Sequence, residues 1–459
     1  MRPVLVLILH AEAPADAGPL VRALAGARRD LAERQRTAFL AAGADVAEIV
    51  AGPPDGLSFG ERLVAEWRRR SGGSTGGAGP KATPPARPPA AAGLIVLGSG
   101  SIPLATSADL RRFVEVAAGP GGHALANNRY SADVVAISRA ADLADLPPLP
   151  ADNALPRWLE ERAGMMVTDL RSRWRLGVDI DTPLDLIVLG GEAAGGEAAR
   201  GAGDVAARGA GGEAAGDEAA QGADGEAAGD EGDAPGAGPL FDEGDAPGAG
   251  PLFGESPVAG RLAALQDVAS NRRAELLVAG RVSAATLTWL QRGVPCRVRA
   301  LIEERGLKAA SKLAQSGAPG ATPGATAGAT PGATAGATAG ATAGATATRP
   351  PHSILGDLLD RDGPEALAAI ASRLGDAAVI DTRVLMAHRY GAAESGWPTA
   401  EDRFASDLLM PDAIADPWLR ALTISAASAP ADHPILLGGH TLVNGGLRLL
   451  AQRARAGNR

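Results

Sequence analysis

The sequence predicts an α/β protein in which a mostly parallel sheet is covered by helices on both faces. Short, nearly continuous apolar runs such as VLVLILHA alternate with longer segments whose apolar residues recur every three or four positions. A strand without polar alternation is typical of a sheet that is buried on both sides. The repeated order of strand and then helix is typical of parallel sheets. A chain of 459 residues has room for more than one folded unit.

The elements of the first half follow this order along the chain. The strand at 4–11 is rich in Val, Leu and Ile, and the helix at 20–43 ends at Gly43, a common helix terminator. We expect further strands at 44–52, 93–100 and 131–140. We expect further helices at 56–70, 107–119 and 155–164, the second of them with Ser107 as its N-cap.

The second half repeats the pattern, as a second α/β unit or as an extension of the same sheet. We expect strands at 274–283 and 377–384, helices at 283–293 and 364–375, and either a strand or a helix at 296–306. The segment HPILLGGHTLVNGG predicts a strand and then a Gly-rich turn, with Asn444, Gly445 and Gly446 opening the final helix.

Three tracts lack the large apolar side chains that a folded core needs. They are a Gly/Pro-rich loop at 71–92, an acidic Gly/Ala tract at 191–255, and a tract of GATAGAT and GATPGAT units at 316–350. The stretch DEGDAPGAGPLF occurs at 230–241 and again at 242–253. We interpret the tracts as solvated inserts; the alternative is a partner-binding arm anchored by the repeated Leu-Phe pairs. The predicted domains are 1–190 and 256–459.

Composition excludes several classes of protein. The net charge of −9 without a basic block disfavours nucleic-acid binding. No apolar run approaches the roughly 18 residues of a membrane span. The single cysteine, Cys296, rules out an internal disulfide and is expected in the core. The apolar run at 4–9 is shorter than the about 7–15 residues of a secretory signal, so we expect a first strand and a cytoplasmic protein.

Candidate site residues follow the predicted strands, because ligands of open α/β sheets bind at the carboxyl ends of the strands. In the first half these residues are His10, Glu12, the segment 98–101, Asp179 and Asp181. Two aspartates at i and i+2 of an extended segment point the same way. Mg²⁺ and Mn²⁺ prefer such oxygen ligands. The alternative is that Asp181 or Thr182 caps a helix that has Pro183 in its first turn.

Three stretches carry a resemblance to a known family. They are AEAPADAGPLVRAL after the first strand, LGSGSIPLATSADL after the third, and VDIDTPLDL at 178–186; GERL at 60–63 adds to them. On these stretches the first 190 residues resemble the nucleotide-diphospho-sugar transferase superfamily, of glycosyltransferase-A type fold. Within it they are most similar to small nucleotidyltransferases of the molybdenum-cofactor and 2-phospholactate guanylyltransferase kind. The resemblance implies a Rossmann-like nucleotidyltransferase domain and a nucleotide or sugar-nucleotide substrate with a small-molecule acceptor. It implies Mg²⁺ or Mn²⁺ on Asp179 and Asp181.

The chain departs from that family at two places. The first loop, which in the family is Gly-rich and carries a base that grips phosphate, holds Glu12 and Asp16, and its nearest base is Arg22. The third strand ends in Gly100 and Ser101, where the family has a metal-binding Asp. Two interpretations therefore remain open. One is a metal-dependent transferase of nucleotidyl or glycosyl groups, and the other is a non-catalytic ligand-binding or scaffold protein with a degenerate nucleotidyltransferase fold.

Two further groups of polar residues are candidate ligand contacts. Asn127, Asn128 and Ser131 precede the fourth expected strand, where they would bind a base or sugar or, alternatively, build an ordinary turn. His123 is expected to be a solvated loop residue.

The second half resembles no family that we can name, but polar residues again follow its strands. The polar residues there are Arg281, Ser283, Asp381, Thr382, Arg383, His440 and Thr441. On parallel neighbouring strands they would share one edge and bind a phosphate or carboxylate through Arg281, Arg383 and His440 beside a Gly-rich helix start. The alternative is a structural ion pair of Arg383 with Asp381 and a simple chain turn at Gly438-Gly439.

Overall fold

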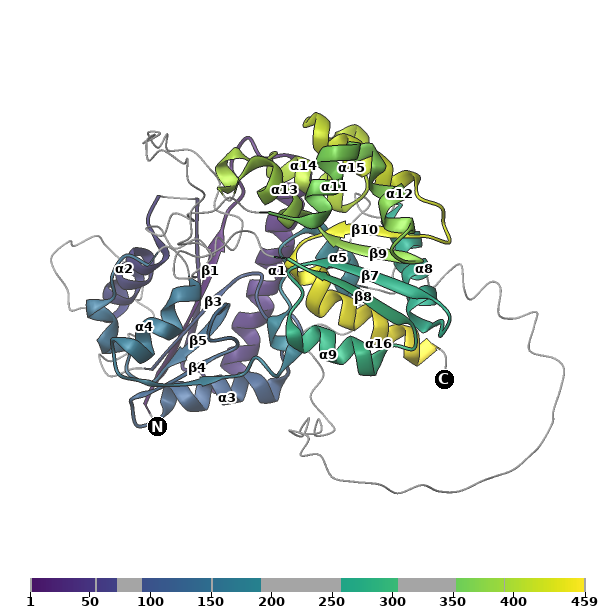
Figure 1. The fold of residues 1–459 in the computed structure, drawn as a ribbon. Coiled ribbons are helices and arrows are strands. Elements are labelled where there is room, and N and C mark those ends of the chain that lie inside the picture. The colour runs from purple at the N-terminus through teal and green to yellow at the C-terminus, as the bar shows by residue number, and fades with distance from the viewer. Residues whose placement is uncertain are drawn as a thin grey trace, which may run out of the picture.

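The computed structural model describes residues 2–53, 56–71, 93–149, 152–190, 257–303, 352–391 and 393–457. The predicted loop beyond residue 71 and the two predicted inserts lie outside the described residues. The described chain forms two sheets flanked by helices, so the predicted α/β class with a mostly parallel sheet is confirmed (Figure 1). No helix in the described ranges is long and apolar enough to span a membrane.

The first sheet has the strand order β2-β1-β3-β5-β4-β6. Its strands are β1 Val4–Ala11, β2 Val46–Gly52, β3 Gly93–Gly98, β4 His123–Ala126, β5 Val134–Ile137 and β6 Met166–Asp169. β1 pairs in parallel with β2 and β3, and β4 pairs in parallel with β6. β5 runs antiparallel to both of its neighbours, β3 and β4. This reversal matters for the site, because it brings the start of β5 to the carboxyl end of β3.

Helices cover both faces of the first sheet. They are α1 Pro19–Ala41, α2 Phe59–Ser71, α3 Ser107–Ala118 and α4 Leu155–Glu161. Successive strand residues point to opposite faces: Val6 and Ile8 pack in the cluster that contains α1 and α3, whereas Leu5 and Leu7 pack in the cluster that contains α2 and α4. Both faces are therefore apolar, which explains why β1 reads as an unbroken apolar run.

The second sheet is fully parallel, with the order β10-β9-β7-β8. Its strands are β7 Glu275–Gly280, β8 Arg297–Ile302, β9 Ala377–Asp381 and β10 Ile435–Gly438. Its helices are α8 Val258–Ser270, α9 Ala284–Gly293, α11 Ile354–Asp362, α12 Leu367–Ser372, α13 Thr382–Tyr390, α14 Ala400–Asp407, α15 Pro417–Ser428 and α16 Leu447–Gly457. Helices α9 and α16 lie on one side of this sheet and α11 to α15 on the other (Figure 1).

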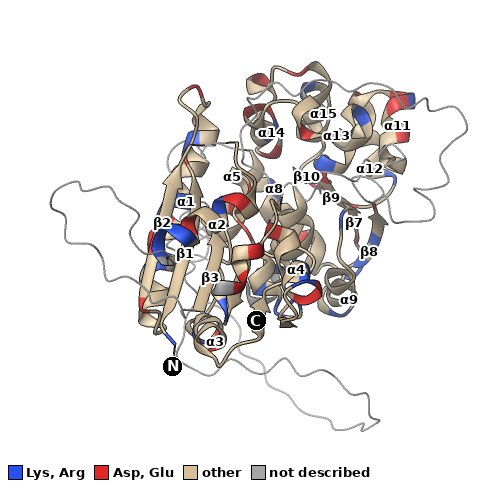
Figure 2. Ribbon diagram, turned by 90° about the vertical axis from the view of Figure 1, so that its left-hand side faces the viewer, with Lys and Arg blue, Asp and Glu red and all other residues tan. Residues whose placement is uncertain are grey.

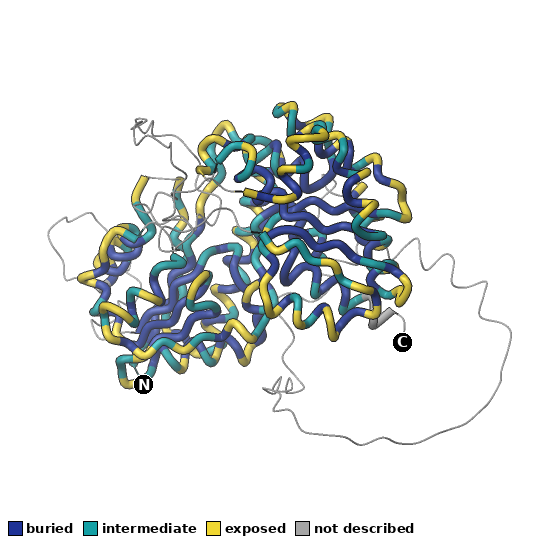
Figure 3. The backbone as a smooth tube through the Cα atoms, in the orientation of Figure 1, coloured by how far each residue is buried: buried dark blue, intermediate teal, exposed yellow. Residues whose placement is uncertain are grey.

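A common core joins the two sheets. Helix α5, Pro183–Gly190, packs with the second sheet, and so does the first half of α1 through Leu20, Leu24 and Leu31. We call each sheet with its helices a lobe, and Figure 3 shows that both lobes contain many buried residues. Because both lobes share this core, residues at their facing edges are held in fixed positions.

Several local features of the structure differ from those that the sequence predicts. The four-residue strands β4 and β6 were not predicted, because segments this short show no clear apolar period. Thr106 rather than Ser107 caps α3, in a capping box with Asp109. The predicted Gly-rich turn at 444–446 is wrong: the chain is already helical at His440, and Leu442–Gly446 form a π-helical turn that continues into α16. The segment 297–302 is a strand.

Candidate functional site

The segment that carries Asp179 and Asp181 lies against the carboxyl end of β3. Asp179 forms an antiparallel bridge with Ser101, and the Ile180 N–H donates to the Gly100 carbonyl over 2.9 Å. A Cβ atom at position 100 would lie 2.8 Å from the Ile180 carbonyl oxygen. Glycine is therefore required here by the close approach of the two backbones, and an aspartate in its place would force the segment away.

A carboxylate that the sequence analysis missed, Asp133, takes the adjoining position. Its carbonyl accepts from the Gly98 N–H over 3.3 Å and from the Ser101 hydroxyl over 3.2 Å. Asn127 holds it from the other side, because Nδ2 of Asn127 donates to Oδ2 of Asp133 over 2.7 Å and Oδ1 of Asn127 accepts from the Asp133 N–H over 2.9 Å. The buried Asn127 amide is thus used to position a carboxylate.

Asp133, Asp152 and Asp179 form an acidic cluster in which each carboxylate is surrounded by protein. Burial, followed by the charge of Asp152, raises the pKa of Asp133 well above its usual value. Burial, followed by the charges of Asp133 and Asp181, does the same for the pKa of Asp179. The pKa of Asp152, in the 3-10 turn Asp152–Ala154, is raised to about 6, mainly by burial. Oδ1 of Asp179 is buried and has no hydrogen-bond partner among the described residues. Such a cluster favours a bound cation.

Asp185 caps helix α5 in this segment. Oδ2 of Asp185 accepts from the N–H groups of Asp181 and Thr182, over 3.0 and 2.7 Å, and from the Thr182 hydroxyl over 3.0 Å. Burial and the Asp181 charge raise the pKa of Asp185 to about 7. The side chain of Asp181 instead pairs with Arg28 of α1 over 3.2 Å and is 30% exposed. Neither Asp179 nor Asp181 is therefore needed as a cap.

The donor set fits a divalent cation by charge. Asp133, Asp179 and Asp181 supply carboxylate oxygens only, which suits Mg²⁺ or Mn²⁺. Mg²⁺ usually takes one or two protein carboxylates together with substrate phosphates. Among the described residues, the only three metal-binding side chains with ligand atoms within 4.8 Å of one another are His352, Asp357 and His388. A cation shared by Asp133, Asp179 and Asp181 would therefore need their side chains to rotate.

The group of His352, Asp357 and His388 is carried by α11, the residues just before it, and α13. Nε2 of His352 is 2.9 Å from Asp357. Nδ1 of His388 accepts from the Ser353 N–H over 3.0 Å, and its Nε2 is 3.1 Å from Asp360. A neutral imidazole that accepts at Nδ1 carries its proton at Nε2. Nε2 of His388 therefore donates to Asp360, and it would bind a metal only after losing that hydrogen bond.

The N-terminus of α1, the helix that follows β1, is capped by a residue of the second lobe. Glu401 of α14 accepts from the N–H groups of Leu20 and Val21 over 2.9 and 3.2 Å. A Cβ atom at position 18 would lie 2.2 Å from the Glu401 carboxyl carbon, so Gly18 gives this contact its room. His10, just behind the loop, contacts the Ser99 hydroxyl over 3.1 Å, and burial followed by the Arg29 and Arg28 charges lowers its pKa.

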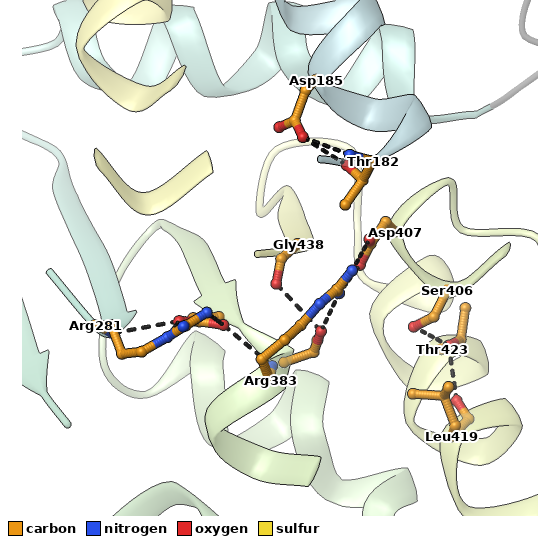
Figure 4. A network of polar contacts seen from close by, with 11 residues as sticks. Thr182, Asp185, Arg281, Arg383, Ser406, Asp407, Leu419, Thr423 and Gly438 are labelled. Atoms are coloured by element: carbon orange, nitrogen blue, oxygen red, sulfur yellow. Dashed lines mark hydrogen bonds and ion pairs between the residues drawn. The ribbon is translucent and has the colours of Figure 1, made fainter. Parts of the chain in front are cut away.

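The carboxyl ends of β7, β9 and β10 meet at one edge of the second sheet, and two arginines there have different roles. The Arg281 Nε and Nη2 atoms donate to the two oxygens of buried Asp381, over 2.6 and 3.2 Å. Arg383 instead points the other way, to Asp407, with both of its nitrogen–oxygen distances 2.6 Å (Figure 4). The alternative prediction, an ion pair of the Arg383 side chain with Asp381, is wrong. Asp381 instead caps α13 by accepting from the backbone N–H of Arg383 over 3.1 Å.

His440 and Arg281 converge beside Asn444. Nδ2 of Asn444 donates to the carbonyls of Arg281 and His440, each over 2.9 Å. A Cβ atom at position 445 would lie 2.5 Å from a methyl carbon of Val178, the residue before Asp179. The predicted glycines therefore serve close packing between the lobes, and they bring Arg281 and His440 to the segment that carries the acidic cluster. Figure 2 shows the Lys and Arg residues in blue and the Asp and Glu residues in red along the ribbon.

The remaining predicted residues lie in a turn or at the surface. Oδ1 of Asn128 accepts from the N–H groups of Tyr130 and Ser131, over 2.9 and 3.3 Å, as in an ordinary Asx turn. Ser131 is exposed, as is His123 at the start of β4. Cys296 is buried, and burial raises the pKa of its thiol to about 11.

Comparisons with known proteins give no assignment. No family model, no curated protein and no solved structure matches the chain.

Proposed function

We propose that the protein is a transferase that uses a divalent cation to move a nucleotidyl or glycosyl group to a small acceptor. One observation carries the proposal. Asp133 and Asp179 converge at the carboxyl end of β3 although no hydrogen bond joins them to each other, and the buried Asp179 Oδ1 atom has no hydrogen-bond partner in the part of the chain that the structure describes. Burial raises the pKa of both carboxyls, and the charge of Asp133 raises that of Asp179 further, which supports a site that is completed by positive charge.

Each residue has a role in this proposal. Asp179 and Asp181 would hold Mg²⁺ or Mn²⁺, with Asp133 beside them, and the cation would supply charge neutralisation for a nucleotide phosphate. Arg28 fixes the segment through its hydrogen bonds to the Ile180 carbonyl, 2.6 Å, and to Asp181, 3.2 Å. Catalysis would then consist mainly of positioning the two substrates and stabilising the transferred group electrostatically.

The test is equilibrium binding of GTP, ATP and sugar nucleotides to the full chain with and without Mn²⁺. We expect binding that needs the cation and that Asp179→Asn and Asp181→Asn each weaken at least tenfold. Asp145→Asn, which changes an exposed carboxylate of the same lobe, is the matched control and should bind as the wild type does. Cation-independent binding, or equal binding by all variants, would contradict the proposal.

A second function, non-catalytic ligand binding or scaffolding, is favoured by one observation. The helix start after β1 attracts phosphate in many α/β proteins, and here the Glu401 carboxylate occupies it. Together with Glu12 and Asp16 in the same loop, Glu401 would repel a triphosphate. If no nucleotide binds to either the wild type or Glu401→Gln under any metal condition, this second function replaces the first.

A further inference from the structure

Several residues between the two lobes are accessible to solvent and yet closely surrounded by protein. His440 is exposed, but burial lowers the pKa of its imidazole. Asp179 is partly exposed, and burial raises the pKa of its carboxyl. We call the part of the surface that carries Asp179, Asp181, Arg281 and His440, beside the close contact of Gly445 with Val178, the inter-lobe recess.

One wall of the inter-lobe recess belongs to the second lobe. Asn444 ties the Arg281 and His440 backbones together, and its neighbour Gly445 packs against Val178 beside Asp179. The charges of Arg281, Asp381 and Asp181 all act on His440. The edge of the second sheet therefore faces Asp181, which lies two residues after Asp179 of the acidic cluster.

Arg281 is oriented for a ligand in a way that Arg383 is not. Asp381, fully buried, holds the Nε and one Nη2 hydrogen of Arg281, and the Arg281 side chain remains 19% exposed. Its other N–H groups have no partner among the described residues. Arg383 has both nitrogens engaged by Asp407 in the interior. His440, for its part, makes no hydrogen bond through its ring to any described residue, so it too is available in the recess.

We propose that Arg281 and His440 bind an oxyanion, a phosphate or carboxylate group, of the small acceptor, so that the second lobe selects the acceptor. The proposal rests on the transferase function proposed above. A guanidinium held by a buried carboxylate presents a rigid fork that matches the geometry of an oxyanion. An imidazole N–H adds a further donor beside it. The cation-binding wall and the anion-binding wall would then hold the two substrates on opposite sides of the recess.

The experiment is an NMR titration of the full chain, labelled at histidine rings, with inorganic phosphate in EDTA. The chain has six histidines, and the His440 signal is identified by its loss in His440→Gln. We expect the chemical shift of the His440 signal to change in a saturable way with phosphate concentration. A parallel titration with acetate tests whether a carboxylate binds at the same place. Arg281→Lys, which keeps the charge but loses the fork, should weaken the binding at least tenfold. Arg299→Ala, on the neighbouring strand β8 and paired with Glu275 at the surface, is the matched control.

Each outcome decides the proposal. An unshifted His440 signal up to high phosphate concentration, or equal affinity in Arg281→Lys and wild type, overturns it. If Arg281→Lys does not fold, the phosphate-induced rise in melting temperature is compared between wild type and His440→Ala, which removes no hydrogen bond. Because EDTA removes divalent cations, this titration measures phosphate binding in the absence of the proposed metal ion. Phosphate binding without metal-dependent nucleotide binding would refute the transferase alone, and the reverse result would refute only the acceptor subsite.

Discussion

Removing the charge of Asp407 should destabilise the protein strongly, because Arg383 would be left buried without a counter-charge. Arg383 and Asp407 have side chains that are 11% and 0% exposed, and two contacts of 2.6 Å join them. Removing one partner of such a buried pair costs about 3–5 kcal/mol. We therefore expect Asp407→Asn to lower the free energy of unfolding by about that amount, measured by urea denaturation followed by circular dichroism.

Two further variants separate this structural role from ligand binding. The double variant Arg383→Met with Asp407→Leu should recover most of the lost stability, since an apolar replacement leaves no buried charge. Asp362→Asn, in the exposed pair with Arg361, should leave stability unchanged. An Asp407→Asn protein as stable as wild type but unable to bind phosphate or nucleotide would refute the reasoning, and Arg383 would then be a ligand contact.

Three other perturbations give distinct results. Glu401→Ala should remove the cap on α1 and lower the free energy of unfolding by about 1–2 kcal/mol, and an unchanged urea midpoint would show that water replaces the cap. In EDTA, the melting temperature should fall as the pH rises from about 4 through 7, because the pKa values of folded Asp152 and Asp185, about 6 and about 7, lie above their unfolded values. The stabilising protons are fully bound below the unfolded pKa and are lost as the pH passes the folded pKa. A melting temperature that rises over this range would contradict the interpretation of these buried carboxyls. Added Mn²⁺ should raise the melting temperature again at the upper end of the range. Gly445→Ala should destabilise by about 1–3 kcal/mol through its 2.5 Å approach to Val178, whereas Gly26→Ala, with open space around it in α1, should not; equal stabilities of the two variants would mean that the lobes separate easily.

Much of the fold could be predicted from the sequence because the strands are buried on both faces. β1 is apolar from Val4 to Leu9 for that reason, and its predicted and observed limits agree. The direction of β5 could not be predicted, because its four apolar residues read the same in a parallel or an antiparallel strand. Only the tertiary pairing reverses it.

Only some residues of the candidate site could be identified from the sequence. Asp179 and Asp181 follow an apolar step, and the sequence therefore points to them as candidates. Asp133 precedes its strand, so a parallel reading would place it at the opposite edge of the sheet, and only the antiparallel pairing of β5 brings it to Asp179. Glu401 reaches α1 across 381 residues of sequence, and no local pattern carries that contact. The ion pair of Arg383 with Asp407 was missed because α14 was not anticipated as its neighbour.

The most direct test of the proposed cation site is the binding of Mn²⁺ measured by electron paramagnetic resonance on the full chain. We predict one Mn²⁺ per chain, bound in the presence of nucleotide. Asp179→Asn should weaken this binding at least tenfold, and His352→Ala, at the separate His/Asp/His group, should leave it unchanged. Mn²⁺ binding that survives Asp179→Asn, or that is lost in His352→Ala, would contradict the placement of the cation at the carboxyl end of β3.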